Sequence, residues 1–154
     1  MKHSLKSLAV IGLLSVLAVS CERDGMVEEE YTEGITKKEL LTHTWKVSDV
    51  KKGGTSILPV VTKLNCITDN ILTFKADGSF VIDEGADVCS PAFAGSGTWS
   101  LAENDTQIKW NFTSPENREV FVPIEQITGT ILRISYYFDD VPLPGLYEMV
   151  LQKQ

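Results

Sequence analysis

Basic residues are scarce in this chain and are nowhere concentrated. The 154 residues include 14 Lys and Arg against 21 Asp and Glu, so the formal net charge is -7. Lysines occur at most as KK pairs, and a surface of this kind repels nucleic acid. Length and composition otherwise fit a single globular domain. Nucleic acid is therefore disfavoured as a partner, and one hydrophobic core is expected.

Long apolar runs are missing beyond residue 20. A bilayer-spanning helix needs roughly 20 apolar residues, and the only candidate run, Leu8 to Val19, has about a dozen. Lys2, His3 and Lys6 precede this run and a small residue follows it, which is the layout of a secretory signal. We therefore expect residues 1–20 to be a cleaved signal peptide.

The signal segment ends on "AVSC", Ala18 to Cys21, which resembles the lipobox of bacterial lipoproteins. The resemblance implies cleavage before Cys21, a diacylglycerol on its sulfur and an acyl chain on its amine, which together anchor stably. Glu22 is not the aspartate that retains lipoproteins in the inner membrane of some Gram-negative bacteria. We therefore expect a lipid anchor at Cys21 in the outer membrane; the alternative is a secreted protein cleaved elsewhere.

Residues 21–35 have few apolar side chains. Between Glu22 and Gly34 the chain carries six acids and two glycines. Such a segment cannot bury enough surface to order itself, so it is predicted to be a flexible acidic tether before a domain at 36–154. An acidic stretch behind a lipidated cysteine also resembles surface-export signals, which makes surface exposure a further expectation.

Helical periodicity is almost absent after residue 35. Thr36 is a candidate N-cap for a short helix in "TKKELL", and short β-branched and aromatic runs with turn residues then predict strands. In "NILTFKADGSFVID", apolar residues face one another if a three-residue loop pairs Phe74 with Phe80. This register predicts that Gly78 adopts the left-handed conformation.

Two more hairpins follow from the same test. A four-residue loop at 103–106 pairs Trp99 with Trp110, and a turn at 128–129 puts the apolar residues of both flanking segments on one face. Pro123 removes one ladder donor, so an edge strand or a bulge is expected there.

The remaining strand signals bring the total to roughly eight or nine. Consecutive hairpins with one apolar face favour a closed up-and-down barrel, because closure leaves no exposed edge and a Greek-key sandwich needs longer crossovers. The predicted fold is therefore all-β, a roughly eight-stranded barrel with a short N-terminal helix. Only the connection Asp139–Gly145 is long enough to form a lid or rim loop.

The three cysteines leave one without a partner, and lipidation of Cys21 accounts for it. Cys66 and Cys89 lack the second Cys/His pair of a zinc site, so a disulfide is the natural interpretation in an exported protein. They flank the Phe74–Phe80 hairpin, whose register sets Cys66 opposite Val88. A bulge at Gly85 would then bring Cys89 into reach.

Four segments, "LLTHTWKV", "CITDNILTFKADGSF", "GSGTWSL" and "VPIEQITGTILRIS", occur in the order seen in the lipocalin-like domain of bacterial lipoproteins. The resemblance covers Glu39 to Lys153 and implies a lipocalin-like barrel in which Trp45 packs across the closed end. His43 stands where true lipocalins carry glycine, and Asn70 and Ile127 also depart from the pattern. The resemblance implies a fold and no particular ligand.

Catalytic and metal-binding patterns are missing. His43 is the only histidine beyond the signal segment, and no nucleophile motif or orienting acid accompanies it. The stretch "DEGAD", Asp83 to Asp87, lacks the twelve-residue ligand pattern of a calcium loop. We therefore expect no enzymatic activity, no metal and no cofactor.

Aromatic side chains are the remaining signal, and the set also includes Phe112 and Phe138. A barrel of about eight strands is either filled by side chains or holds one small ligand. If it is hollow, the protein binds a small apolar or amphipathic molecule, with a candidate pocket formed by Phe74, Phe80, Trp99, Trp110, Tyr136 and Tyr147. If it is solid, the protein is a scaffold or inhibitor that acts on an unspecified protein partner through its outer surface or rim loop.

Overall fold

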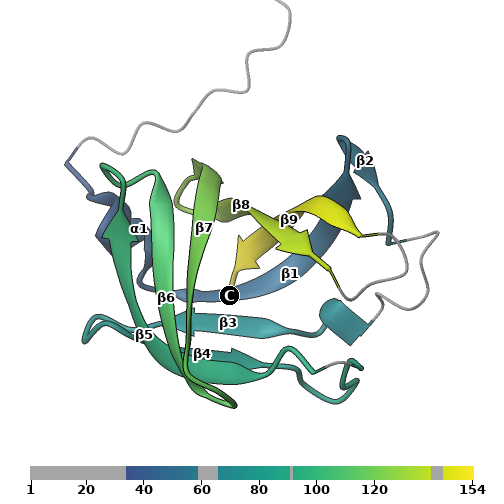
Figure 1. Cartoon of the computed structure of the whole chain (residues 1–154). Coiled ribbons are helices and arrows are strands. Elements are labelled where there is room, and N and C mark those ends of the chain that lie inside the picture. Colours follow the sequence, from purple (N-terminus) through teal and green to yellow (C-terminus); the bar gives the residue numbers. More distant parts are fainter. Residues whose placement is uncertain (1–33, 59–65, 91, 140–143) are drawn as a thin grey trace, which may run out of the picture.

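An antiparallel sheet that closes on itself forms the body of the protein (Figure 1). The computed structural model describes residues 34–58, 66–90, 92–139 and 144–154. The predicted signal peptide, Cys21, and most of the tether and of the rim loop lie outside the described residues. The described strands are β1 (Thr44–Lys52), β2 (Thr55–Ser56), β3 (Ile71–Phe74), β4 (Ser79–Asp83), β5 (Gly95–Ala102), β6 (Gln107–Ser114), β7 (Arg118–Ile127), β8 (Ile131–Phe138) and β9 (Gly145–Lys153).

Strand β1 closes the barrel because it pairs on both of its sides. Residues 45–51 run antiparallel to β9, and residues 44–46 pair with β3 on the opposite edge. Strand β2 adds two residues beside the far end of β1. Within the described residues the closed barrel thus consists of β1 and β3 to β9, eight strands in sequential order. The predicted all-β, up-and-down barrel of about eight strands is confirmed.

Helix α1 (Lys37–Leu41) precedes the barrel. The Thr36 hydroxyl accepts a hydrogen bond from the Glu39 N–H at 3.2 Å, and the Glu39 carboxylate accepts one from the Thr36 N–H at 2.8 Å. This capping box satisfies donors that a helix start leaves unpaired. The bond from the Thr36 backbone is also the largest cause that lowers the pKa of the Glu39 carboxyl. The predicted short helix with Thr36 as its N-cap is confirmed.

The first predicted hairpin register is confirmed in β3 and β4. Phe74 lies opposite Phe80, so both apolar faces point into the barrel. Gly78 has φ +83° and donates its N–H to the Lys75 carbonyl at 3.0 Å. Glycine suits this position because the left-handed region is costly for residues with a Cβ.

The other two hairpins also form as expected. Trp99 lies opposite Trp110 across the four-residue turn, and the turn between β7 and β8 falls at residues 128–130. Strand β7 lies between β6 and β8, so Pro123 is not on an edge. A register shift between Ile124 and Gln126 interrupts the ladder beside it. The bulge is therefore the alternative that accommodates this proline.

The two ends of the barrel differ. The three hairpin turns just described lie together with α1 at one end, named here the closed end, where Lys37 Nζ donates to the Asp105 carbonyl at 3.0 Å. Trp45 is fully buried there, and its indole N–H donates to the Leu41 carbonyl of α1 at 3.0 Å. The connections from β4 to β5, from β6 to β7 and from β8 to β9 leave the opposite end, named the mouth.

Aromatic side chains fill the half of the barrel that adjoins the closed end. The rings of Phe74 and Trp99 lie 5.1 Å apart edge to face, and those of Phe80 and Trp110 lie 5.7 Å apart and stacked. All four side chains are buried. Such pairs contribute about 0.5–1.5 kcal/mol each beyond the area that they bury. Any space for a ligand therefore has to lie toward the mouth.

Candidate functional site

A cavity of about 380 Å³ lies in the mouth half of the barrel. It extends from the exposed rim residues Glu116 and Asp139 down to the buried side chains of Leu72 and Trp110. Pockets for small molecules have volumes of about 300–1,000 Å³, so this one is large enough for a modest ligand. Its aliphatic wall includes Val47, Ile67, Leu72, Ile82, Met149 and Leu151.

Of the six aromatic residues predicted to form a pocket, two line this cavity: Trp110 on β6 and Tyr136 on β8. The other four are not among the residues that line it. Phe74, Phe80 and Trp99 point inward as expected, but they lie in the half filled by aromatic packing. Tyr147 is also buried, where its ring packs 5.5 Å from Phe138. These four side chains support the pocket from behind.

Three aromatic side chains outside those six also line the cavity: Phe93, Phe112 and Phe138. Phe112 comes two residues after Trp110 on β6, and Phe138 comes two residues after Tyr136 on β8. Residues two apart in a strand share a face, so the strand pattern already placed Phe112 and Phe138 on the inward side. Phe93 precedes β5 in a connection that has no periodicity, and its ring lies 5.4 Å from Phe138. No sequence signal identified Phe93.

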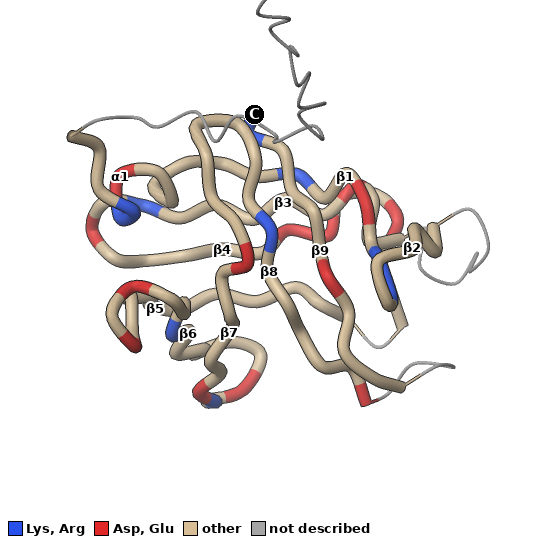
Figure 2. Tube along the Cα trace, turned by 90° about the horizontal axis from the view of Figure 1, so that it is seen from above, with Lys and Arg blue, Asp and Glu red and all other residues tan. Residues whose placement is uncertain are grey.

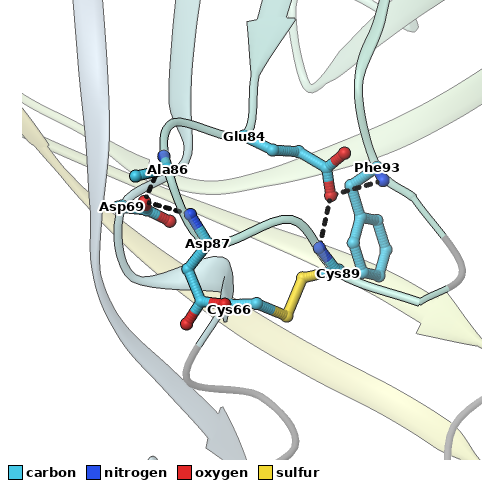
Figure 3. Close-up of a disulfide and its surroundings, with 7 residues drawn as sticks. All are labelled: Cys66, Asp69, Glu84, Ala86, Asp87, Cys89 and Phe93. Carbon is cyan, nitrogen blue, oxygen red and sulfur yellow. Dashed lines mark hydrogen bonds between the residues drawn. A yellow bond between two sulfur atoms is a disulfide. The ribbon is translucent and has the colours of Figure 1, made fainter.

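The connection that carries Phe93 is tied to the segment before β3 (Figure 3). The structure contains the Cys66–Cys89 disulfide, as predicted. The Asp69 carboxylate accepts hydrogen bonds from the N–H groups of Ala86 and Asp87 at 2.9 and 3.0 Å. The bond from Asp87 is the largest cause of a lowered pKa at the Asp69 carboxyl. A covalent bond and a carboxylate thus hold the same two segments together.

A second carboxylate fixes Phe93 itself. Glu84 is 4% exposed, and its Oε1 accepts hydrogen bonds from the Cys89 N–H at 3.1 Å and the Phe93 N–H at 2.8 Å (Figure 3). Buried carboxylates require such partners because unpaired buried charge is very costly. Glu84 therefore holds the backbone of Phe93 at the cavity wall.

The strand register predicted around the disulfide is wrong. The ladder between β3 and β4 ends at Asp83, so Cys66 and Val88 are not paired across strands. Gly85 has φ +68° and lies in the turn that follows β4, not in a bulge. The physical reason is Asp69, whose hydrogen bonds draw this turn out of the ladder. The disulfide joins two loops at the mouth.

Two buried polar atoms in the cavity-lining residues have no hydrogen-bond partner within the described residues. They are Oδ1 of Asn70, a residue 6% exposed, and Nε1 of Trp110, a residue 4% exposed. Unpartnered buried polar groups are uncommon in folded proteins, and each one calls for an explanation.

The rim of the cavity carries charges of both signs. Glu116, Arg118 and Asp139 line it, and Arg118 lies over the Phe112 ring, with its guanidinium carbon 4.5 Å from the ring centroid. Figure 2 shows basic residues dispersed among acidic ones, with both signs close together where β6 turns into β7. Among the described residues, Lys52 adds a further cation beside the mouth, where its Nζ donates to the Pro144 carbonyl at 2.9 Å.

His43 lies at the closed end and is not among the residues that line the cavity. Its Nε2 is 3.0 Å from Lys153 Nζ, and burial together with that positive charge lowers the pKa of the imidazole. In the "DEGAD" stretch, the Asp83 carboxylate accepts a bond from the Gly85 N–H at 2.9 Å, so this acid stabilises the turn. No cluster of three metal-ligating side chains occurs among the described residues.

None of the helices in the described part of the chain has both the length and the apolar character to cross a membrane. Residues 41–134 match the lipocalin-like domain family. A lipocalin-like protein from Bacteroides uniformis has a similar solved structure, with 16% sequence identity, a TM-score of 0.49, and coverage of 75% of this chain and 99% of that one. A search of curated proteins finds no match. Because the family match spans more than half of the sequence, the chain belongs to the lipocalin-like domain family.

Proposed function

We propose that this protein is a membrane-anchored, non-catalytic lipoprotein that binds a small apolar or amphipathic molecule inside its barrel. The observation that carries the proposal is the cavity of about 380 Å³ at the mouth. Most of its lining side chains are aliphatic or aromatic, and the charged groups Glu116, Arg118 and Asp139 lie at its rim. Binding would proceed by burial, since each Å² of apolar surface removed from water contributes about 25 cal/mol.

The construction of the barrel supports entry from the mouth alone. At the closed end Trp45 is fully buried beneath α1, and the aromatic cluster of Phe74, Phe80 and Trp99 fills the space above it. At the mouth, the disulfide and Glu84 hold Phe93 in place before any ligand arrives. A preformed wall lowers the entropic cost of binding, because fewer side chains have to be ordered when the ligand arrives.

The anchor is proposed from the sequence. "AVSC" places a lipidated Cys21 ahead of an acidic tether at 21–35, which would hold the barrel beside the outer membrane of a Gram-negative bacterium. The residue after the cysteine and the acidic tether favour the outer membrane and its outer surface. A ligand that partitions into lipid would then be concentrated near the mouth.

A scaffold or inhibitor function is the second candidate. Tyr137 on β8 and Leu146 on β9 lie opposite each other with 58% and 59% of their surfaces exposed. Large apolar side chains gathered on an outer wall are typical of protein contact surfaces. In this case the partner would bind the outside of the barrel, although Tyr137 also borders the cavity.

Native mass spectrometry of the protein purified from its own host tests the binder. We expect the same small molecule in repeated preparations, and its loss in Met149→Trp, whose bulk occupies the cavity. The matched control is Phe121→Ser, which changes an outer-wall side chain that is 48% exposed and should retain the molecule. Circular dichroism verifies that both variants fold. Folded wild-type protein that repeatedly carries no molecule would contradict the proposal.

A further inference from the structure

The ladder between β7 and β8 joins only the halves of these strands that adjoin the closed end. Its rungs lie within residues 124–127 of β7 and 132–134 of β8, and Figure 1 shows the strands diverging beyond them. No rung joins residues 118–123 with residues 135–138, all of which belong to the described part of the chain. On their other sides these two segments pair with β6 and β9. Toward the mouth, each strand therefore has one edge that takes no part in a ladder.

The sequence explains why this ladder ends in the middle of both strands. The Ile124 N–H donates to the Thr106 carbonyl at 2.9 Å, on the side of β6. Successive N–H groups of a strand point to opposite sides, so position 123 is one that would donate to β8, and Pro123 has no N–H. Glu125 is the residue left over by the register shift, and its carboxylate accepts a hydrogen bond from the Ser135 hydroxyl at 2.6 Å. A proline and a bulge thus end the ladder.

The cavity reaches the edge of β8 that this interruption leaves. Its lining includes Arg118 at the start of β7 and residues 136–139 at the end of β8. Tyr136 and Tyr137 are consecutive, so their side chains point to opposite faces of the strand, yet both residues border the cavity. Tyr137 is 58% exposed and lies opposite Leu146, which is not among the lining residues. The cavity therefore extends past the edge of β8 to the outer wall, through what is named here the side opening.

Burial of the inward side chains falls at the same level of the barrel. On β7, Val122 is fully buried, whereas Val120, two residues nearer the mouth, is only partly buried. On β8, Ile134 is fully buried and Tyr136 is only partly buried. Residues two apart in a strand share a face, so orientation does not cause these differences. The wall is less closed where the ladder is missing.

From these observations, and resting on the proposed function, we infer that the ligand is an elongated amphipathic molecule that leaves the cavity through the side opening. Its apolar part lies inside the barrel, and its polar part lies outside against Tyr137. A polar group that stays in water avoids the cost of burial, so the side opening accommodates a head group that the apolar interior would exclude. Tyrosine suits this position, because its ring offers apolar contact area and its hydroxyl remains hydrated.

Two probes of different length test this inference by titration of the full-length protein. Decyl maltoside has an apolar chain and a polar head, and N-phenyl-1-naphthylamine is a short fluorescent compound without a head group. Wild-type protein should bind both. Tyr137→Ala should weaken the binding of decyl maltoside at least about threefold more than that of N-phenyl-1-naphthylamine, as expected for the loss of one aromatic contact outside the cavity.

Two control variants change equally exposed apolar residues that do not line the cavity. Leu146→Ala removes the side chain opposite Tyr137, which is 59% exposed, and Val88→Ala removes one in the connection between β4 and β5, which is 63% exposed. Both controls should bind each probe within about twofold of the wild-type affinity. Circular dichroism verifies the fold of all three variants.

The outcomes separate the inference from the function on which it rests. The inference would be overturned, with the binder left standing, by wild-type protein that binds N-phenyl-1-naphthylamine but not decyl maltoside. An equal effect of Tyr137→Ala on both probes, or a loss of decyl maltoside binding as large in either control, would overturn it too. Failure of folded wild-type protein to bind either probe, together with an empty barrel in native mass spectrometry, would contradict the proposed function itself.

Discussion

Removal of the Cys66–Cys89 disulfide should destabilise the barrel by about 3 kcal/mol. The cysteines are separated by 23 residues, and a cross-link over that length restricts the unfolded chain by about 3 kcal/mol at 25 °C. The appropriate change is the double variant Cys66→Ser with Cys89→Ser, because it leaves no free thiol. For a domain of this size the midpoint of thermal unfolding should fall by about 10 °C.

Urea unfolding followed by tryptophan fluorescence measures this loss, since Trp45, Trp99 and Trp110 are all buried. Reduction of the wild-type protein should reproduce the effect of the double variant, and reductant added to the double variant should change nothing. A loss below about 1 kcal/mol would refute the loop-closure reasoning. The hydrogen bonds accepted by Asp69 and Glu84 would then suffice to hold the mouth.

Three further predictions concern stability. A methyl group at Gly97 would collide with the backbone of Asn111, so Gly97→Ala should cost at least about 2 kcal/mol in urea unfolding, and an unchanged midpoint would contradict the close approach of β5 and β6. The Asp69 carboxyl has a pKa below its unfolded value because the Asp87 N–H bonds to it, so its stabilisation is full above about pH 4 and is lost as pH falls through the folded pKa. Asp69→Asn should therefore flatten the acid limb of stability against pH, and an identical limb would refute this role. Trp45→Phe removes the hydrogen bond to the Leu41 carbonyl of α1 and part of the packing at the closed end, so it should lower the free energy of unfolding by about 2 kcal/mol in the same assay. Wild-type stability in this variant would show that the closed end does not depend on the Trp45 indole.

Hairpin registers were predictable because apolar residues have to face one another across a pair of strands. Trp99 opposite Trp110 and Phe74 opposite Phe80 follow from that requirement and from turn chemistry alone. Helix α1 was predictable for a similarly local reason, since Thr36 and Glu39 form a capping box within four residues. Closure of the barrel followed from the order of the hairpins.

Height along the barrel was not predictable from alternation. A period of two tells which side chains point inward, but it does not tell how far each one lies from the mouth. Phe74 and Tyr136 have the same inward pattern, yet Phe74 packs against Trp99 near the closed end while Tyr136 lines the cavity.

The mouth was the least predictable region, because its structure depends on contacts between distant segments. The hydrogen bonds to Asp69 draw the turn after β4 out of the ladder between β3 and β4. Val88, the expected cross-strand partner of Cys66, is therefore not paired with it. Glu84 places Phe93 at the cavity wall through its backbone N–H. Both effects come from carboxylates that the composition suggested were only part of an acidic surface.

Methyl NMR tests the central claim, that the ligand lies inside the barrel, most directly. The folded protein, labelled at Met, Ile and Leu methyl groups, is titrated with an organic extract of its host cells. We predict shifts at Met149 and Ile67, which line the cavity, and none at Leu41, which is buried at the closed end. Shifts confined to Leu146 on the outer wall, or no shifts at all, would contradict the account.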